Sequence, residues 1–443
     1  MPDTPFDHQR EDLIAQQAEK SDSIAIISDD GQWTYRDLHV LIQNSCSQLA
    51  GSTHSFHPFI CEKNLESIAL FFSLLRLKKI AFPLNAKLPE HQIKDILQKI
   101  EDHDSVHEKQ LATFLLTSGS SGKPKIACHS LGNHYFSAMG SNSVIPLSPN
   151  DRWLLTLPLY HVGGLQILFR SFVASSAVVI SNKPMIETLL NKKITHLSLV
   201  PTQLYRLLNE DHSVLKRLSS QLKCILLGGG PISAELYKKA IELGLRVCPS
   251  YGLTEMTSQV CTDSSQSPYL SCGRPLPFRE VKVSEDGEIL VKGETLFQGY
   301  VENSTPLLNL NDGWFATGDL GSFGADGTLH FLGRKDHLFI SGGENIQPEE
   351  IEEHLLRFPG IVQAIVVPLN DEEFGARPVA FVLNEEKSFC PDAIRDFLKV
   401  YLPSYKVPIR FYPLNCEDRL KPDRSTLRAL AAAFEEQKQV PSA

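Results

Sequence analysis

Short, mostly apolar runs alternate with amphipathic stretches over the first 260 or so residues of the chain. Runs of this length predict strands, and they lie at residues 24–27, 113–116, 153–157, 196–200 and 224–227. Apolar residues at helical spacing predict helices between them, at residues 38–49, 67–77, 90–100 and 234–243. This alternation is typical of α/β layers built on a largely parallel sheet.

The pattern changes at about residues 262–333, where alternating β patterns are closed by tight turns. Residues 281–283 and 288–291 flank an Asp286-Gly287 turn, and residues 321–323 and 328–331 flank Asp326-Gly327. Asp-Gly between alternating apolar residues is a strong hairpin signal. We therefore predict a small, β-barrel-like subdomain in this region.

After Gly333 the pattern returns to mixed helices and strands, with helices predicted at 347–357 and 391–402 and strands at 361–367 and 378–383. The polar segment Gly333-Arg334-Lys335-Asp336 marks the joint. We therefore predict an α/β fold in which a large N-terminal domain of layered α/β subdomains, residues 1–334, is hinged to a small α+β C-terminal domain, residues 335–443.

Composition and charge narrow the classes of protein to consider. The net charge of −9 argues against binding to nucleic acid, whose phosphates attract basic surfaces. Charged residues interrupt the most apolar window, residues 68–84, so no membrane span is predicted. The first twenty residues lack the apolar stretch of a signal peptide, and the nine cysteines contain no C-x-x-C pair. We expect a cytoplasmic protein with reduced thiols, and the sequence leaves open whether it forms a homo-oligomer.

A predicted strand runs into a loop of glycines, hydroxyls and two lysines, Thr117-Ser118-Gly119-Ser120-Ser121-Gly122-Lys123-Pro124-Lys125. Small residues let backbone N–H groups approach an anion, hydroxyls donate hydrogen bonds, and lysine supplies positive charge. The spacing differs from the G-x-x-x-x-G-K-[ST] pattern of P-loop NTPases. The segment is chemically a phosphate cradle, although a solvated Gly/Ser loop would have the same composition.

Two further segments carry groups that suit a nucleotide. The first, Ser250 to Glu255, places an aromatic ring, a hydroxyl and a carboxylate on one short loop. A purine can stack on Tyr251, Thr254 can bond a phosphate, and Glu255 can hold Mg²⁺. The second segment, Thr317-Gly318-Asp319, offers a carboxylate that can accept both ribose hydroxyls, although such a triplet is usually only a turn.

In their order along the chain, these motifs resemble those of the adenylate-forming superfamily, which includes acyl- and aryl-CoA ligases, peptide-synthetase adenylation domains and luciferases. The resemblance spans about residues 23–427 and rests on residues 117–125, 159–161, 227–231, 251–255, 317–319, 333–336 and 342–352. Within the superfamily, the chain is most similar to the o-succinylbenzoate-CoA ligases of menaquinone biosynthesis, on residues 197–208, 273–277, 341–346 and 373–380.

The resemblance implies a two-step reaction that uses ATP, Mg²⁺ and coenzyme A. A carboxylate attacks the α-phosphorus of ATP, which gives an acyl-adenylate and pyrophosphate, and the coenzyme A thiolate then displaces AMP. Preorganised donors aimed at the phosphate oxygens would supply most of the catalysis. By position in the motif, the β- and γ-phosphates would be bound by Thr117, Ser118, Gly119, Ser120, Ser121, Gly122 and Lys125.

The same resemblance assigns the remaining parts of the nucleotide. Thr254 would contact the α-phosphate, Glu255 the magnesium ion and Tyr251 the adenine. Asp319 together with Arg334 would hold the ribose.

In the superfamily a C-terminal lysine bridges the reacting carboxylate and the α-phosphate. Lys421 is the candidate, although Leu420 stands where relatives carry glycine, and Lys406 is the alternative. Rotation of the C-terminal domain about Asp336 would remove this lysine before coenzyme A enters. The turn at Gly342 and Gly343 would then border the coenzyme A channel, or it is simply a tight turn before the next helix.

The acid substrate is a small molecule, and o-succinylbenzoate carries an aromatic carboxylate that a group either cationic or rich in hydrogen-bond donors must recognise. Arg206 lies three residues beyond Gln203 in a helical stretch, so both can face one pocket, and an arginine fork matches a carboxylate. A surface salt bridge is the alternative for Arg206. The resemblance places His161 in the acyl pocket, as a gate after pyrophosphate forms, and a flat pocket wall at Gly228, Gly229 and Gly230.

Three other functions fit parts of this pattern. A fatty- or aryl-acid CoA ligase would use the same two steps with a wholly apolar pocket. An adenylation module would deliver its acyl group to a carrier protein, but no carrier domain follows Lys421. A catalytically inactive, nucleotide-binding regulatory protein is the third alternative, favoured only by Leu420.

Overall fold

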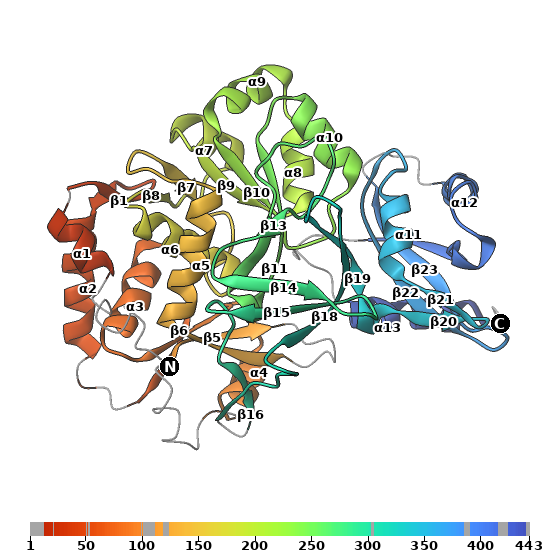
Figure 1. Cartoon of the computed structure of the whole chain (residues 1–443), viewed down its shortest axis with the longest axis horizontal. Helices are drawn as coiled ribbons and strands as arrows, with labels where there is room; N and C mark the ends of the chain where they lie inside the picture. Colours follow the sequence, from red (N-terminus) through yellow and green to blue (C-terminus); the bar gives the residue numbers. More distant parts are fainter. Residues whose placement is uncertain are drawn as a thin grey trace.

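The computed structural model describes residues 13–20, 22–49, 51, 54–98, 100, 111–117, 124–302, 305–384, 390–414 and 424–439. The described residues form a large N-terminal domain of α/β layers and a smaller C-terminal domain (Figure 1). Among the helices described, none has both the length and the apolar character needed to cross a bilayer. This architecture agrees with the predicted α/β class.

A nine-stranded sheet organises the N-terminal domain, in the order β13-β12-β11-β10-β9-β7-β8-β1-β2. Its strands are β1 (Ile24–Ile27), β2 (Gln32–Thr34), β7 (Arg152–Leu154), β8 (Ala177–Val179), β9 (His196–Leu199), β10 (Cys224–Leu227), β11 (Val247–Leu253), β12 (Ser258–Thr262) and β13 (Arg274–Pro275). From β1 to β11 the neighbours run parallel, and the strands at both edges are antiparallel. Four-residue apolar strands such as β10 are buried along their whole length, as expected of a sheet covered on both faces.

Helices cover the two faces of this sheet. They are α1 (Leu13–Lys20), α2 (Tyr35–Leu49), α3 (Leu65–Arg76), α5 (Leu131–Val144), α6 (Val162–Val173), α7 (Met185–Asn191), α8 (Pro201–Leu208), α9 (His212–Gln221) and α10 (Ala234–Glu242). One core joins α2, α3 and α6 to the sheet, and a second joins α8, α9 and α10 to its other face.

A six-stranded sheet packs beside the first, in the order β17-β16-β6-β5-β4-β3. Its elements are β3 (Phe56–Ile60), β4 (Ile80–Leu84), β5 (Leu111–Thr117), β6 (Lys125–Ser130), β16 (Gly299–Glu302) and β17 (Thr305–Leu307), with helix α4 (Glu90–Gln98). β5 and β6 are antiparallel, and Thr117 faces Lys125 in their register. The predicted phosphate segment therefore connects two paired strands.

The predicted hairpins form a four-stranded antiparallel sheet of β14 (Arg279–Val283), β15 (Glu288–Gly293), β18 (Phe315–Phe323) and β19 (Leu329–Arg334). This sheet is open, because its outer strands β14 and β19 do not pair with each other. The expected subdomain is also interrupted, since β16 and β17 leave it and pair with the six-stranded sheet through β6.

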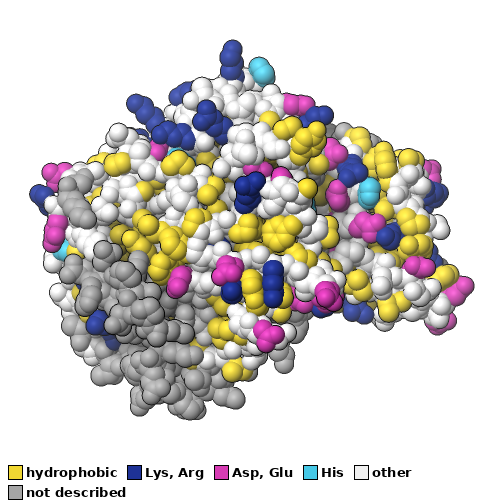
Figure 2. Space-filling model, viewed as in Figure 1, with side chains coloured by type: hydrophobic (Ala, Val, Ile, Leu, Met, Phe, Trp, Pro, Cys, Tyr) yellow, Lys and Arg dark blue, Asp and Glu magenta, His cyan; other side chains and the backbone are white. Residues whose placement is uncertain are grey.

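After β19 the chain forms a 3₁₀ turn, η3 (Lys335–His337), and a small hairpin, β20 (Phe339–Ser341) and β21 (Glu344–Ile346). Its elements continue with α11 (Pro348–Leu355), β22 (Ile361–Asp371), β23 (Gly375–Asn384), α12 (Pro391–Lys399), η4 (Ser404–Lys406), β24 (Arg410–Pro413) and α13 (Arg424–Gln439). α11 and α12 pack on one face of the β22-β23-β24 sheet, and α13 packs on the other. In the space-filling view a notch separates the lower edges of the two domains (Figure 2).

Candidate active site

The centre of the candidate site is a strained turn that follows β11. Thr254 to Met256 form one 3₁₀ turn, and Thr257 and Ser258 then adopt positive φ angles of 54° and 102°. Such conformations cost of order 1–3 kcal/mol each and persist only where the surroundings enforce them. The backbone therefore reverses its direction sharply after Glu255, which leaves Thr254 and Glu255 at the tip of the turn.

Three buried contacts hold this turn from behind. Nε2 of His129, in β6, lies 2.8 Å from the carbonyl oxygen of Thr254. The backbone N–H of Phe297 donates to the carbonyl of Glu255 at 2.8 Å, and the hydroxyl of Ser137 donates to the carbonyl of Thr257 at 2.7 Å. Burial lowers the pKa of His129 to about 4, so the ring is neutral and its Nε2–H can donate to the turn.

The two ends of the predicted phosphate segment face each other across the β5–β6 pair. Thr117 ends β5 and is half-buried, and Lys125 begins β6 with an exposed side chain. The intervening site residues, Ser118, Gly119, Ser120, Ser121 and Gly122, lie outside the described residues.

Tyr300 contacts both of the charged groups that the sequence assigned to phosphate and magnesium. Its hydroxyl donates a hydrogen bond to Oε1 of Glu255, and Nζ of Lys125 lies 4.9 Å from the centre of its ring. No local pattern around Tyr300 indicates this position. It arises because β16 leaves the β subdomain and pairs with β6, which places residue 300 opposite Ala127.

The surroundings of Glu255 fit magnesium better than a metal that needs a cage of protein ligands. Within the described residues no group of three or more His, Cys, Asp or Glu side chains could hold a metal ion. Magnesium is commonly bound by one or two carboxylates, with substrate phosphates and water completing its shell. The hydrogen bond from Tyr300 uses Oε1 of Glu255, so Oε2 is the oxygen that could ligate the ion.

Asp319 and Arg334 meet across the β18–β19 pair, as the ribose assignment requires. Oδ1 of Asp319 accepts a hydrogen bond from Nη1 of Arg334 at 2.8 Å, and Oδ2 accepts one from the hydroxyl of Tyr251 at 2.6 Å. The same guanidinium also forms a two-pronged pair with Asp336, at 2.9 and 3.0 Å. The predicted hinge residue is therefore bonded directly to the predicted ribose site.

Burial and charge set the protonation of this cluster. Burial raises the pKa of Asp319, and the hydrogen bond from Tyr251 and the charge of Arg334 oppose that rise. Burial and the neighbouring Asp319 raise the pKa of the Tyr251 hydroxyl, so it remains a hydrogen-bond donor. Burial disfavours the charge of Arg334, but its pairs with Asp336 and Asp319 outweigh this effect and raise its pKa.

The ring of Tyr251 is only 7% exposed, and it stacks on Phe331 with ring centres 6.1 Å apart. Its hydroxyl is committed to Asp319. The structure thus shows a contact from Tyr251 to Asp319, the carboxylate predicted to bind ribose, and sequence reasoning missed this contact. The contact of Tyr251 with adenine stays a prediction.

The predicted acyl-pocket residues come from the loops at the ends of neighbouring strands. His161 precedes α6 and is exposed, and a Cβ on Gly228 would lie 2.9 Å from the carbonyl oxygen of Ser250. A Cβ on Gly230 would lie 3.7 Å from Cδ of Pro201, at the start of α8. The glycine loop, with Gly229 at a positive φ of 81°, is therefore held between α8 and the end of β11.

Gln203 and Arg206 lie on α8 as predicted, but their environments differ. Oε1 of Gln203 accepts a hydrogen bond from the backbone N–H of Val200 at 3.1 Å, at the start of the helix. Arg206 is exposed in the last turn. The structure shows no ion pair that would account for Arg206 within the described residues, so its role in binding the substrate stays a prediction.

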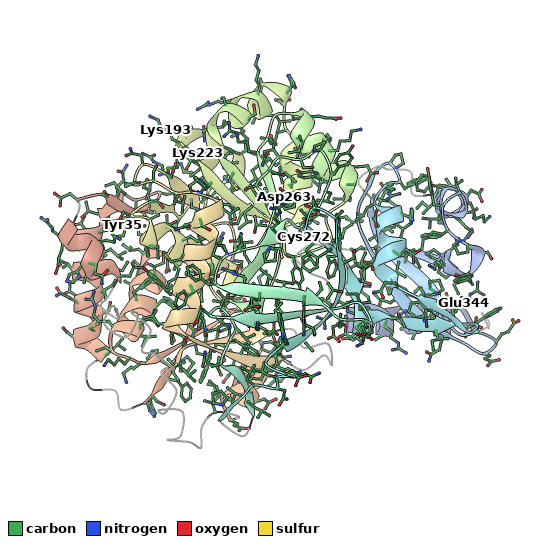
Figure 3. All side chains as sticks on the ribbon, viewed as in Figure 1. Tyr35, Lys193, Lys223, Asp263, Cys272 and Glu344 are labelled. Carbon is green, nitrogen blue, oxygen red and sulfur yellow. The ribbon has the colours of Figure 1, made fainter. Side chains whose placement is uncertain are left out.

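The glycine turn of the C-terminal domain joins the two strands of its small hairpin. Gly342 and Gly343 have φ angles of 58° and 87° and form the exposed turn between β20 and β21. Figure 3 places Glu344, the next residue, at the outer end of the C-terminal domain, far from Asp263 and Cys272 in the N-terminal domain.

The two candidate lysines of the C-terminal domain differ in what the structure describes. Lys421 lies outside the described residues. Nζ of Lys406 contacts both carboxylate oxygens of Glu350, at 2.6 and 2.8 Å, and its side chain is 16% exposed. In this orientation Lys406 is therefore held by an ion pair within its own domain.

Two family models match the chain. The model described as "AMP-binding enzyme" covers residues 98–301, and the model described as "AMP-binding enzyme C-terminal domain" covers residues 350–418. Together they include the turn at Glu255, Tyr300 and the core of the C-terminal domain.

Individual proteins give a finer comparison. The 2-succinylbenzoate-CoA ligase of Escherichia coli K12 is 34% identical over 426 residues, which cover 89% of this chain and 92% of that protein. The o-succinylbenzoate CoA synthetase of Bacillus subtilis, solved in complex with the acyl-adenylate intermediate OSB-AMP, superposes with a TM-score of 0.81 at 30% identity over 98% of both chains. The B. subtilis enzyme solved with ATP and a magnesium ion also gives a TM-score of 0.81 at 30% identity, over 94% of this chain and 98% of that chain.

Proposed function

This chain belongs to the AMP-binding enzymes and, within them, to the 2-succinylbenzoate-CoA ligases, and from this premise we propose how its own residues carry out the reaction. It is an AMP-forming acid-thiol ligase that uses ATP, Mg²⁺ and coenzyme A to convert 2-succinylbenzoate, a small-molecule acid, to its coenzyme A thioester in menaquinone biosynthesis. Two clusters of contacts carry the proposal. In one, Tyr300 contacts both Lys125 and Glu255, the residues predicted to bind phosphate and magnesium. In the other, Asp319 accepts hydrogen bonds from Tyr251 and Arg334.

The first half-reaction forms the acyl-adenylate. The succinyl carboxylate attacks the α-phosphorus, and the bond to pyrophosphate breaks. Lys125, with Thr117 and the loop 118–122, binds the β- and γ-phosphates, and the hydroxyl of Thr254 donates to the α-phosphate. Glu255 holds magnesium, which neutralises charge on the phosphate oxygens. Because the turn of Thr254 is fixed from behind, its donor needs little reorganisation as charge develops.

The nucleoside is fixed by groups that have no part in bond making. Asp319 accepts the ribose hydroxyls, Arg334 orients Asp319, and Tyr251 holds the other carboxylate oxygen while its ring faces the adenine pocket. Accurate fixation of the nucleoside keeps the α-phosphorus in line with the acid, and such positioning acts together with the electrostatic stabilisation of the phosphate oxygens.

The acid lies between His161, the glycine loop 228–230 and helix α8. Gly228 to Gly230 leave a flat wall for the aromatic ring, and Arg206 with Gln203 reads the aromatic carboxylate. The exposed position of Arg206 at the end of α8 supports this role, because no ion pair within the described residues competes for it. A fatty-acid ligase would gain nothing from a cation there.

The second half-reaction needs a different domain orientation. Lys421 serves adenylation, and the C-terminal domain then rotates about Asp336, so that Gly342 and Gly343 line the path of coenzyme A. The exposure of this turn supports the proposal, because an exposed turn is free to border the path of coenzyme A after the rotation. Coenzyme A thiolate then attacks the acyl carbon, and AMP leaves.

The proposal places the enzyme in the cytoplasm, where ATP and coenzyme A are available, and the boundary between its domains at residues 334 and 335. A homo-oligomer is compatible with the proposal.

Substitution of Arg206 tests the assignment of the acid. In Arg206→Leu, we expect the KM for 2-succinylbenzoate to rise about tenfold or more with the KM for ATP unchanged, because a charged hydrogen-bonded pair contributes roughly 1.5–3 kcal/mol. Arg217→Leu is the matched control, since Arg217 is exposed on the neighbouring helix α9 and, among the described residues, donates only to the carbonyl of Leu190. An equal KM for the acid in both variants would contradict the role of Arg206.

A further inference from the structure

Tyr300 is held rigidly between the two opposite charges that the site uses. β16 pairs with β6 so that Tyr300 lies opposite Ala127, and Lys125 is two residues before Ala127 on the same face of β6. The ring packs edge-on against Phe297, with ring centres 4.9 Å apart. Its position is therefore set by strand pairing and by a buried aromatic contact, and not by the charges it meets.

Each end of the tyrosine side chain has a different partner. The ammonium group of Lys125 lies over the ring, 4.9 Å from its centre, where the negative face of the ring attracts a cation. The hydroxyl donates to Oε1 of Glu255. Among the residues that the structure describes, Lys125 and Glu255 form no ion pair with each other, although both reach the same tyrosine.

We propose that Tyr300 is a positioning residue that keeps Lys125 and Glu255 apart, so that the lysine stays available for phosphate and the carboxylate for magnesium. This inference rests on the proposed function. The alternative shows why this matters: without the ring, the ammonium group and the carboxylate that now both contact Tyr300 would attract each other. Their ion pair would neutralise the phosphate-binding charge and engage carboxylate oxygens that magnesium needs.

The hydroxyl has a second, separable effect. It fixes Oε1 of Glu255, so the carboxylate would already be oriented when magnesium binds, with Oε2 available to hold it. The ring therefore separates the charges, and the hydroxyl orients one of them.

Two substitutions separate these effects, and ATP binding measured by calorimetry, with Mg²⁺ and with EDTA, reports on them without turnover. Tyr300→Phe keeps the spacer and loses the hydroxyl. We expect its metal-free affinity for ATP to stay within about twofold of the wild type, and the gain in affinity from Mg²⁺ to fall about tenfold. Tyr300→Leu loses both, so we expect the metal-free affinity to fall about tenfold as well.

The lysine provides a further check by rescue. In Tyr300→Leu combined with Lys125→Met, the cation that captures Glu255 is gone, so we expect the gain from Mg²⁺ to recover relative to Tyr300→Leu even though metal-free binding stays weak. A merely structural role for Tyr300 would give additive losses. Tyr237→Phe and Tyr237→Leu serve as controls, because Tyr237 is a buried tyrosine of α10 whose hydroxyl donates to the carbonyl of Ser267.

The outcomes distinguish this inference from the proposed function. A wild-type protein that binds no ATP with or without Mg²⁺ would overturn both. If the wild type binds, the inference is overturned when Tyr300→Phe keeps the full gain from Mg²⁺, or when its metal-free affinity falls as much as its metal-bound affinity. Because Tyr300→Phe retains the ring and its packing on Phe297, this test stands even if Tyr300→Leu does not fold.

Discussion

A buried ion-pair cluster in the C-terminal domain allows a quantitative prediction. Arg424 begins α13, three residues after Lys421. Its guanidinium contacts Glu352 at 2.7 and 2.8 Å and Glu349 at 3.3 Å, and donates to the carbonyl of Val366 at 2.6 Å. The cluster therefore fixes the end of the segment that carries the candidate adenylation lysine.

The perturbation is Arg424→Met, which keeps an unbranched apolar stem and removes the guanidinium group with its charge. Glu352 is 1% exposed and Glu349 9% exposed, so the variant leaves buried carboxylates without their principal cation. Breaking a buried pair by removing one partner costs about 3–5 kcal/mol. Arg410→Met is the control, because Arg410 pairs with Glu435 at an exposed site, where a pair contributes about 0–1 kcal/mol.

The sign of the pH dependence follows from the carboxylates. Burial raises the pKa of Glu352, and the charge of Arg424 opposes this rise in the wild type. In the variant that opposition is lost, so the folded-state pKa lies further above the unfolded value. A raised folded-state pKa gives stability that is present at low pH and is lost as pH rises through that pKa. We expect the deficit of Arg424→Met to grow between pH 5 and pH 7.

Amide hydrogen exchange is the appropriate assay, because it reports the local stability of α11 and β22 without assuming that a two-domain chain unfolds in one step. We expect protection in these elements to fall by about 3–5 kcal/mol at pH 7 and by less at pH 5. A deficit as small as that of Arg410→Met, or one that is constant with pH, would refute the reasoning.

Three further substitutions test individual roles. Asp319→Asn should raise the KM for ATP in pyrophosphate release about 10- to 100-fold, since it removes charged hydrogen bonds of roughly 1.5–3 kcal/mol; an unchanged KM would remove Asp319 from the ribose site. His129→Leu should slow adenylation about tenfold or more through the turn at Thr254, whereas His196→Leu, at an equally buried histidine stacked on Trp153, should alter stability only. Comparable rates in these two variants would show that His129 does not position the turn. Lys421→Ala should abolish adenylation and largely spare thioester formation from supplied acyl-adenylate, and equal loss of both would exclude its proposed role.

Local signals made much of this fold predictable. The turns at Asp286-Gly287 and Asp326-Gly327 both close hairpins, and the glycines have φ angles of 82° and 79°. At the second turn the carboxylate of Asp326 accepts hydrogen bonds from the backbone and side chain of Thr328. Such turns depend on a few adjacent residues, which is why the sequence indicates them.

Long-range pairing was not predictable in the same way. β16 pairs with β6, which lies about 170 residues earlier in the chain, so the expected β subdomain is interrupted. The same pairing places Tyr300 in the site, which no local sequence pattern indicates. Arg170 of α6 shows the same limit, because arginine side chains are rarely fully buried. It is 1% exposed, and its guanidinium lies 5.3 Å from the ring centre of Trp153.

In the site too, some contacts could be predicted from the sequence and others could not. The meeting of Asp319 and Arg334 could be predicted because both belong to recognisable motifs, and the structure brings them to 2.8 Å. The bond from Tyr251 to Asp319 joins two motifs whose separate roles gave no hint of contact. Motifs thus identify the chemistry of a site, whereas its supporting contacts depend on tertiary pairing.

The most direct test of the central claim is pyrophosphate release with ATP, Mg²⁺ and a panel of acids that includes 2-succinylbenzoate, benzoate and a medium-chain fatty acid. The account predicts release with 2-succinylbenzoate alone, followed by AMP formation that depends on coenzyme A. Release with another acid but not with 2-succinylbenzoate would contradict the substrate, and no release with any acid would contradict the enzymatic function.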